Sequence, residues 1–344
     1  MTTIRNSMSR LPLFSIATLT PVILIAAGAL WGGIWVVLSV LYLTGLTSLL
    51  DRLVQRISPA SEFPSGTPLS VTLALCHFAL LPLVVAGLSS AWLNLPEKAG
   101  LFFAAGLFFG QVSNANAHEL IHRGQRALHR LGMWVYVTLL FGHHTSAHVL
   151  VHHRHVATPA DPNTSRKGEG FYRYALRAWI GSFRAGYTAE AARLDRIGRA
   201  PWHNPYLIYI GGAVFCLILA GQIGGMAAIL AYLALAGHAQ AQLLLSDYVQ
   251  HYGLLRGTDA QGKPEPTTAR HSWNSPHWFS SALMLNATRH SDHHAHPNRP
   301  YPALRLPAEG PMLPRPLPVM ASIALVPPLW RRVMDPQVEH WKNA

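Results

Sequence analysis

The sequence predicts an all-α integral membrane protein with about six transmembrane helices and a histidine-rich region on the cytoplasmic side. Half of the 344 residues are hydrophobic and only 12% are charged, whereas roughly 25% of the residues of a soluble domain are charged. The apolar residues form runs close to the roughly 20 residues that a bilayer requires. The 20 histidines instead gather in the polar segments between and after these runs.

Six apolar runs are predicted to cross the membrane. The first is too long for a signal-peptide core and lacks a clear small-residue cleavage site, so we expect it to remain as a span. The fourth continues through small and polar residues to His118, and a Gly-rich turn over 221–225 separates the last two. The six runs cover about 11–31, 34–50, 69–92, 99–112, 206–220 and 226–245.

The distribution of charge predicts the orientation. Lys and Arg total 27 against 15 Asp and Glu, a net charge of +12 with His neutral, and most basic residues lie between the apolar runs, as in cytoplasmic loops. Arg5 and Arg10 precede the first run, and Arg52 and Arg56 follow the second. With a cytoplasmic N-terminus, these loops and the end of the fourth run all face the cytoplasm. This predicts a multi-pass protein of the inner membrane.

The positive net charge also indicates which kinds of partner to expect. In a membrane protein it indicates cytoplasmic loops rather than nucleic-acid binding, and we expect no nucleic-acid partner. It favours contact with anionic membrane lipid or with an acidic soluble protein. The only cysteines, Cys76 and Cys216, lie inside apolar runs, which argues against a disulfide framework or a Cys-based metal site.

We expect one membrane-embedded unit over residues 1–344. The apolar run at 131–142 is short, and a crossing there would place His148 opposite His118, so we predict that it does not cross. Residues 154–204 are polar and basic, and residues 253–344 show little helical periodicity. The unit is divided into spans one to four at 11–112, a cytoplasmic histidine region at 113–204, spans five and six at 206–245 and a second cytoplasmic region at 246–344.

Histidines form three boxes on the predicted cytoplasmic side. In the first, His118 to His122 (HELIH), helical spacing puts both imidazoles on one face. The same spacing is the H-E-x-x-H pattern of zinc metalloproteases, in which Glu119 would be the general base. The motif alone does not choose between these two kinds of site.

The second box runs from His148 to His153 (HVLVHH). On an α-helix, His148 and His152 would share a face and His153 would point about 100° away, so one helix could serve two metals. The third box, His290 to His294 (HSDHH), has related spacing, and His251 follows the sixth apolar run. The number of histidines decides between metal classes, because a catalytic zinc takes three protein ligands whereas nine histidines can hold two metals. Two imidazole-rich sites favour iron for oxygen chemistry, although zinc and copper also accept imidazole.

These stretches resemble the signature sequences of the integral-membrane alkane monooxygenases, which belong to the wider group of membrane diiron desaturases and hydroxylases. The matching segments are His118 to Arg123 (HELIHR), His148 to Pro159 (HVLVHHRHVATP), His251 to Leu254 (HYGL) and Arg289 to Pro297 (RHSDHHAHP). The last is the most specific, because desaturases share the histidine spacing but not the residues between.

The resemblance implies a non-haem diiron centre that hydroxylates an alkane at its terminal methyl group with O2. It implies electrons from rubredoxin and an NAD(P)H-dependent reductase, and a hydrophobic small molecule as substrate. The implied iron ligands are His118, His122, His148, His152, His153, His251, His290, His293 and His294.

Residues near the ligands can orient the imidazoles. In two places the sequence departs from the family, which often has an acidic residue where this chain has Ala147 and Gln250. The candidates for such supporting roles are Glu119, Asp247, Asp292, His144 and His296, although the three acidic residues could equally be local caps. The other nine histidines are expected to be structural or solvated.

Several other functions fit parts of the pattern. Hydroxylation of an aromatic methyl group, as in xylene monooxygenases, and fatty-acyl desaturation are close alternatives. An intramembrane zinc protease would use only His118, Glu119 and His122. A metal transporter would need ionisable groups within the spans, where only His77 and His238 occur.

Overall fold

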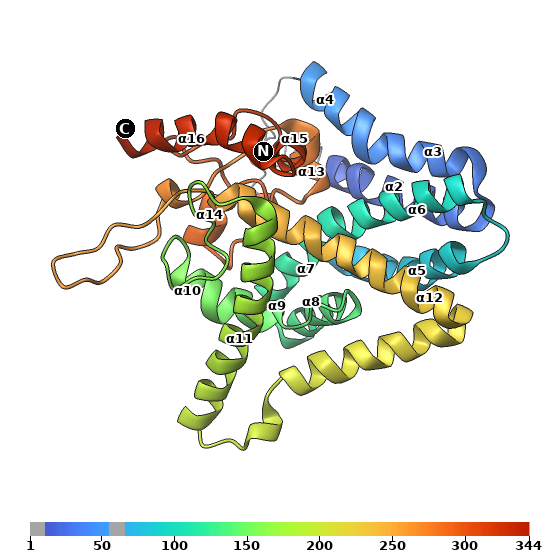
Figure 1. The fold of residues 1–344 in the computed structure, drawn as a ribbon, viewed down its shortest axis with the longest axis horizontal. Coiled ribbons are helices and arrows are strands. Elements are labelled where there is room, and N and C mark those ends of the chain that lie inside the picture. Colours follow the sequence, from blue (N-terminus) through green and yellow to red (C-terminus); the bar gives the residue numbers. More distant parts are fainter. Residues whose placement is uncertain (1–10, 55–65, 344) are drawn as a thin grey trace, which may run out of the picture.

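A computed structural model describes residues 11–54 and 66–343 (Figure 1). Within these residues every element is a helix and the β contacts are two isolated bridges, so the all-α prediction is confirmed. Arg5, Arg10 and Arg56 lie outside the described residues. The elements are α2 (Leu11–Trp31), α3 (Gly33–Leu41), η1 (Tyr42–Leu46), α4 (Thr47–Leu53), α5 (Thr67–Ser89), α6 (Leu95–Leu107), η2 (Phe108–Ser113), α7 (Asn114–Ile121), α8 (Arg126–Thr138), α9 (His144–Ala147), η3 (His148–His152), α10 (His153–His155), α11 (Phe171–Arg196), η4 (Pro201–His203), α12 (Tyr206–His251), η5 (Ala269–His271), α13 (Trp278–Leu283), α14 (His290–Ala295), η6 (Tyr301–Ala303), α15 (Leu317–Ala324) and α16 (Pro327–Asn343).

The long helices differ in part from the six separate spans expected. Among the described residues, four helical stretches are long and apolar enough to cross a membrane: Leu13–Trp31, Gly33–Leu53, Thr67–Ser89 and Tyr206–His251. The last, α12, contains both of the final apolar runs, and non-helical angles at Gly224 and Gly225 bend it sharply between them (Figure 1). The predicted fourth span is a composite of α6 and η2, and α7 continues from it.

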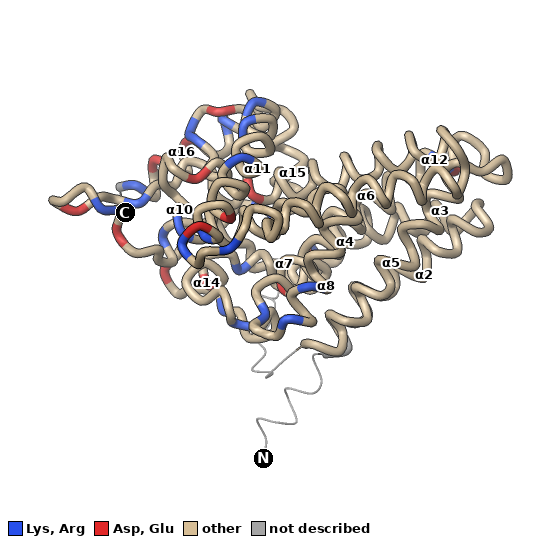
Figure 2. The backbone as a smooth tube through the Cα atoms, turned by 90° about the horizontal axis from the view of Figure 1, so that it is seen from below, with Lys and Arg blue, Asp and Glu red and all other residues tan. Residues whose placement is uncertain are grey.

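The two ends of this bundle have different chemistry. At one end short loops are tied together by hydrogen bonds between distant parts of the sequence, from Gly33 N to Glu97 Oε1 at 2.7 Å and from Trp92 Nε1 to Ala29 O at 3.1 Å. At the other end Asp51 accepts hydrogen bonds from the backbone N–H groups of Phe279 and Ser280, which fixes the start of α13. Figure 2 shows charged residues crowded around this second end and almost none along the helices that extend from it.

Three helices outside the long bundle build the walls of the charged end. Residues 131–142 lie largely in α8, which has 13 residues and is therefore about 20 Å long, too short to span and in agreement with the prediction. The 26-residue α11 and the 17-residue α16 were not predicted from their polar sequences. α11 depends on tertiary contacts: the Tyr174 hydroxyl donates to Asn163 O, and Arg177 pairs with Glu169 at 2.7 Å.

Candidate metal centre

The first pair of histidines is placed by a change of helical register. η2 is a π-helical segment between α6 and α7, and such an inserted turn rotates everything that follows it relative to the helix before. α7 then carries His118 and His122 one turn apart, with ring centroids 5.1 Å from each other. The carboxamide of Asn116 donates to Ser70 O at 2.8 Å, which anchors α7 against α5.

The second box differs from the α-helical arrangement expected. η3 is a π-helical segment, in which hydrogen bonds run from i to i+5 and residues five apart come into line. His148 and His153 therefore point together, with their Nε2 atoms 2.9 Å apart, while His152 turns toward a different group. The expected pairing of His148 with His152 on one face is thus wrong, although one short helix does serve two sites.

The third box is an ordinary short helix. On α14, His290 and His294 lie one turn apart with Nε2 atoms 3.1 Å from each other, and His293 faces the other way, 3.1 Å from His153 Nε2. The side-chain oxygen of Asn274, fully buried, accepts from both the backbone N–H and the hydroxyl of Ser291. Asn274 thus sets the position of α14, a role for which its sequence context gave no signal.

The structure gathers all nine predicted ligands into two adjacent groups. In each group the nearest ligand nitrogens of all members lie within 4.8 Å of one another. The groups are linked through the two short helices that carry histidines of both, η3–α10 and α14. The five-histidine group is His118, His122, His148, His153 and His293, and the four-histidine group is His152, His251, His290 and His294.

The spacing of the nitrogens fits metal ligation. Nε2 atoms lie 2.7 Å apart between His118 and His148, and 2.8 Å apart between His290 and His251. Metal–imidazole bonds are about 2.0–2.1 Å long, so two ligands at right angles around one ion would be about 3 Å apart. These contacts have the length of edges in a coordination shell.

The protonation state of the imidazoles also fits metal ligation. Burial, reinforced by neighbouring imidazoles, holds the pKa of His148, His293 and His294 well below its usual value of 6.5. These side chains are therefore neutral at pH 7, the form that offers a lone pair to a metal. Among the described residues, His122 Nε2 and His152 Nε2 have no hydrogen-bond partner, which leaves both lone pairs directed into the groups.

The carboxylate of Asp161 orients one ligand. Its Oδ2 lies 2.9 Å from His152 Nδ1, and both side chains are buried. Burial opposes protonation, but the charge of Asp161 and this hydrogen bond raise the pKa of His152. A proton held on Nδ1 leaves Nε2 free for metal, the usual arrangement of a carboxylate behind a ligating histidine. Asp161 is held by the N–H of Asn163 and the hydroxyl of Thr164, and sequence reasoning missed it.

The acidic residues proposed as supports have other partners. Glu119 pairs with Arg123 at 2.5 Å. Asp292 binds Arg299 at 2.5 Å and the exposed His296 at 3.1 Å, on the outer face of α14. Asp247 accepts from Asn163 Nδ2 at 2.7 Å, and thus reaches His152 only through the Asn163–Asp161 chain. These contacts of all three favour the local structural role over direct support of a ligand.

The remaining candidates lie close to the site but outside the two groups. His144 packs beside His148, with ring centroids 5.0 Å apart, and stacks on Phe141. Gln250 accepts from Ser246 at 2.8 Å and donates to Ala287 O at 3.0 Å. The other ten histidines also lie outside the two groups. They are His77, His129, His143, His155, His203, His238, His271, His277, His340 and His296, the last of which contacts Asp292.

One departure from the family pattern has a packing explanation. Ala147 is buried and faces α11, where a Cβ on Gly186 would come within 3.1 Å of its Cα and Cβ atoms. A larger side chain at 147 would crowd this tight contact between α9 and α11. The carboxylate that lies beside Ala147 in the structure is that of Asp161, which bonds His152.

Comparison with known proteins gives the family. A family model described as fatty acid desaturase matches residues 90–320. The chain is 32% identical to alkane 1-monooxygenase of Pseudomonas putida over 321 residues, 92% of this chain and 78% of the relative. It is 34% identical to alkane 1-monooxygenase 2 of Pseudomonas aeruginosa over 88% of this chain and 84% of the relative. The chain belongs to the alkane 1-monooxygenase family.

A more distant relative lies beside these. The xylene/toluene monooxygenase hydroxylase component of Pseudomonas putida is 28% identical over 91% of this chain and 85% of the relative. As a member of the alkane 1-monooxygenase family, the protein is a membrane non-haem diiron monooxygenase. This confirms the resemblance seen in the sequence and replaces the zinc-protease interpretation of the HELIH motif.

The register of η3 makes a prediction about paired substitutions. Because His148 and His153 share one group and His152 and His251 the other, His148→Ala/His153→Ala should leave one metal per chain, as should His152→Ala/His251→Ala. His148→Ala/His152→Ala should damage both sites. Metal content measured by elemental analysis checks this, with the exposed neighbour His155→Ala as the control that keeps both metals. Retention of a full site by His148→Ala/His152→Ala would contradict the π-helical register.

The bond from Asp161 makes a second prediction. Asp161→Ala should weaken metal binding by roughly 10- to 100-fold, because His152 loses the group that fixes its tautomer and direction. Asp161→Asn retains a carbonyl acceptor and should recover part of the affinity. Metal titration of apoprotein in detergent measures both, beside Asp195→Ala on the exposed side of α11. Equal affinities for Asp161→Ala and the control would remove Asp161 from the site.

Proposed function

We propose that this enzyme hydroxylates the terminal methyl group of a medium-chain alkane at two irons, one in each histidine group. The observation that carries the proposal is the convergence of nine imidazoles, six of them buried and three half-buried, in two adjacent groups at the polar end of an apolar bundle. Alkane oxidation is the activity in the names of the relatives. The overall reaction joins R–CH3, O2, two electrons and two protons to give R–CH2OH and water.

The chain's own residues would hold the irons, orient the imidazole ligands and enclose the reacting carbon. Bound iron would supply the activation of O2, while the histidines fix its position and the bundle keeps bulk water from the reacting carbon. A cavity bordered by His118, His148 and His290 opens beside both groups, between the η2–α7 segment, α12 and α15. An apolar chain can reach this cavity from the lipid between the helices, which gives the reaction a reason to take place in a membrane.

The orientation of the protein follows from its charge. The histidine groups lie at the end where Lys and Arg collect (Figure 2), and positive residues favour the cytoplasmic side. We therefore place the enzyme in the inner membrane with its metal centre facing the cytoplasm. This supports the expected division into cytoplasmic histidine regions and membrane spans.

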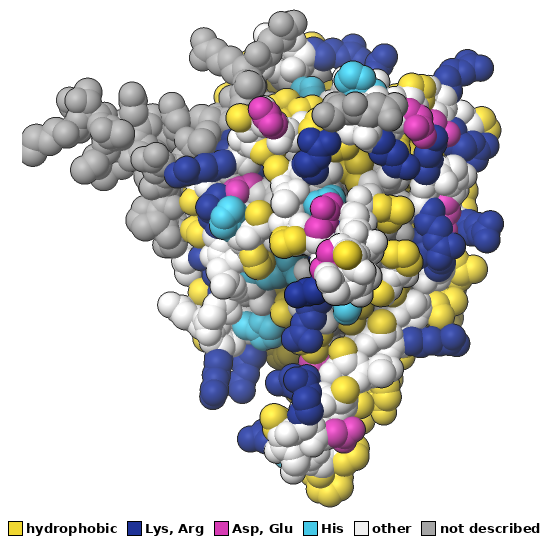
Figure 3. All heavy atoms as spheres, turned by 90° about the vertical axis from the view of Figure 1, so that its left-hand side faces the viewer, with side chains coloured by type: hydrophobic (Ala, Val, Ile, Leu, Met, Phe, Trp, Pro, Cys, Tyr) yellow, Lys and Arg dark blue, Asp and Glu magenta, His cyan; other side chains and the backbone are white. Residues whose placement is uncertain are grey.

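Electrons must come from another protein, because the sequence has neither a Cys cluster nor a nucleotide-binding fingerprint. The half-buried His153 is followed directly by the exposed Arg154 and His155, so the five-histidine group approaches the surface here. Arg256 Nη2 donates to Arg154 O, which adds a second cation beside it. Figure 3 shows Lys and Arg side chains spread over this end of the molecule, with histidines visible between them. An acidic rubredoxin, reduced by its NAD(P)H-dependent reductase, fits this face.

The activity is tested with iron-loaded protein in lipid nanodiscs. With dithionite or a reduced rubredoxin, octane or decane should give the primary alcohol under air and nothing under nitrogen, as measured by gas chromatography and mass spectrometry. The iron-free protein is the control. Benzylic alcohol from xylene with no alkanol from alkane would favour the aromatic alternative, and an alkene from an acyl substrate would favour desaturation. Protein with two irons that oxidises none of them would refute the proposal.

The docking face is tested by reversing a charge. Arg154→Glu should slow rubredoxin-driven turnover several-fold at low salt, and the difference from wild type should shrink as salt screens the surface. Turnover with dithionite should be unaffected, since that reductant needs no docking. Arg199→Glu, the same change at an exposed residue beyond the end of α11, is the control. Equal slowing by both variants would place the electron donor elsewhere.

A further inference from the structure

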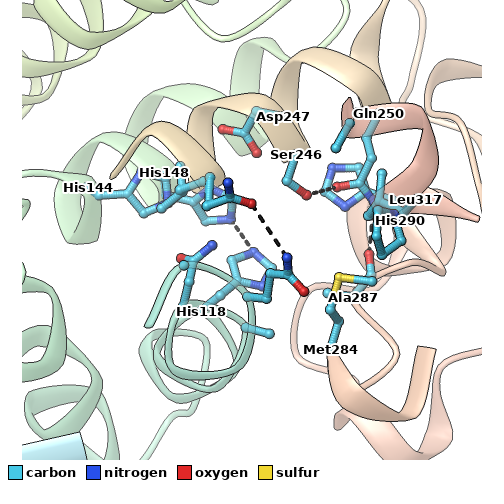
Figure 4. A pocket seen from close by; sticks show the side chains of 18 of the residues that line it. His118, His144, His148, Ser246, Asp247, Gln250, Met284, Ala287, His290 and Leu317 are labelled. Carbon is cyan, nitrogen blue, oxygen red and sulfur yellow. Dashed lines mark hydrogen bonds between the residues drawn. The ribbon is translucent and has the colours of Figure 1, made fainter. Parts of the chain in front are cut away.

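The cavity beside the metal groups has a hydrogen-bonding wall (Figure 4). Four residues spaced four apart along α12, His238, Gln242, Ser246 and Gln250, share one helical face. Gln242, Ser246 and Gln250 line the cavity together with Gln111 from η2. Alkanes offer no hydrogen bonds, so a row of amides and hydroxyls here needs another explanation.

Close helix packing fixes this wall in place. A Cβ on Gly106 would lie 2.0 Å from His238 Nδ1, and one on Gly110 would lie 2.4 Å from Gln242 Cβ. Only glycine allows α12 to come so near to α6 and η2 at these two positions, an arrangement known from membrane helix pairs. The amide of Gln242 is therefore held against η2, where it meets Gln111.

The hydrogen bonds of the wall are unequally satisfied. Gln250 has a partner at each end of its amide, since it accepts from Ser246 and donates to Ala287 O. Gln111 Nε2 reaches Gln242 Oε1 only at 3.5 Å, and Gln242 Nε2 reaches His238 Nε2 only at 3.4 Å. Gln111 Oε1 is buried, and no described residue donates to it. The amide pair of Gln111 and Gln242, both lining the cavity, thus has an unpaired acceptor and weakly engaged donors.

A pure alkane would leave these amides unpaired, which is unfavourable for buried polar groups. A hydroxyl group matches them, because its O–H can donate to Gln111 Oε1 and its oxygen can accept from an amide N–H. By helical rise the pair lies about 10 Å from His118 and about 13 Å from His251. That separation suits an alkyl chain whose methyl end lies at the metals and whose hydroxyl lies at the amides.

We propose that the Gln111–Gln242 amide pair binds the hydroxyl of a medium-chain alcohol, so that the enzyme oxidises the far methyl group of alkanols in preference to plain alkanes. The proposal rests on the hydroxylase function proposed above and names its substrate class. HO–(CH2)n–CH3 with O2, two electrons from the carrier protein and two protons gives HO–(CH2)n–CH2OH and water. The cavity has about 60 Å³ of free volume, room for only a few waters, so chain entry displaces flexible side chains such as Met284.

The test compares decan-1-ol with decane on wild type, Gln242→Leu and Gln111→Leu. Binding is measured on metal-free protein in nanodiscs, from the rise in unfolding temperature with ligand concentration. The ratio of the two affinities in the wild type is divided by the ratio in each variant, which cancels both membrane partitioning and any general loss of folded protein. Each Leu variant should reduce the alcohol preference roughly tenfold. Gln222→Leu, an exposed position near the bend of α12, should leave it unchanged.

Turnover provides the second readout. Iron-loaded wild type should form decane-1,10-diol from decan-1-ol faster than decan-1-ol from decane, and the order should reverse in Gln242→Leu. Equal gains by both ligands in the Leu variants would mean that the amides hold only water, and would overturn the proposal. Oxidation of neither ligand would refute the hydroxylase function, while the binding ratios on metal-free protein would still decide whether the amides recognise a hydroxyl.

Discussion

Nine imidazoles brought together away from water are the constraint on which the rest of this structure depends. Each must stay neutral and keep one nitrogen lone pair directed at its group, because a charged or misdirected ring would be destabilised by its neighbours. Burial lowers the pKa of rings such as His293 and His294, whereas Asp161 raises that of His152. The bond from Asp161 to His152 secures the second condition, the direction of the lone pair, for one ring. A bound cation would relieve the crowding of nitrogens that remains.

Hydrogen bonds around the two histidine groups also fix the positions of the ligands. The Asn274 side chain accepts two hydrogen bonds from Ser291 and so fixes α14, and the indole N–H of Trp273 donates to Tyr252 O beside His251. Asp51, on a helix that enters from the bundle, accepts from the first N–H groups of α13. These contacts join segments more than fifteen residues apart, and together they couple the position of the histidines to the folding of the membrane helices.

The sequence predicted the histidines better than it predicted how they are grouped. Residue type and spacing were enough to select nine side chains, because imidazole has few other reasons to recur in boxes at the edge of apolar runs. The grouping depended on η3, and an inserted π turn has no composition that distinguishes HVLVHH from an α-helical segment. Asp161 was missed for a related reason: it approaches His152 through a loop, and no periodicity connects the two.

The sequence also predicted some of the surrounding helices better than others. Apolar runs revealed the long helices because their stability in lipid depends on composition, but α11 is polar and is held by particular contacts such as Arg177 with Glu169. Its packing also explains Ala147, whose neighbour across the interface is the glycine at 186. Sequence patterns therefore predict elements that interact with a uniform solvent, lipid or water, and fail for elements whose environment is a specific surface of the same protein.

A wall of polar side chains inside a membrane bundle lowers the stability of the bundle, so its presence needs an explanation. Amides at Gln111 and Gln242 lower the stability of an apolar interior unless something binds them, and the two glycines opposite α12 hold them where water is scarce. A leucine at either position would give a better-packed bundle and a cavity more suited to alkanes. The retention of both amides beside a centre that oxidises methyl groups is most simply explained if the molecule that occupies the cavity carries a hydrogen-bonding group of its own.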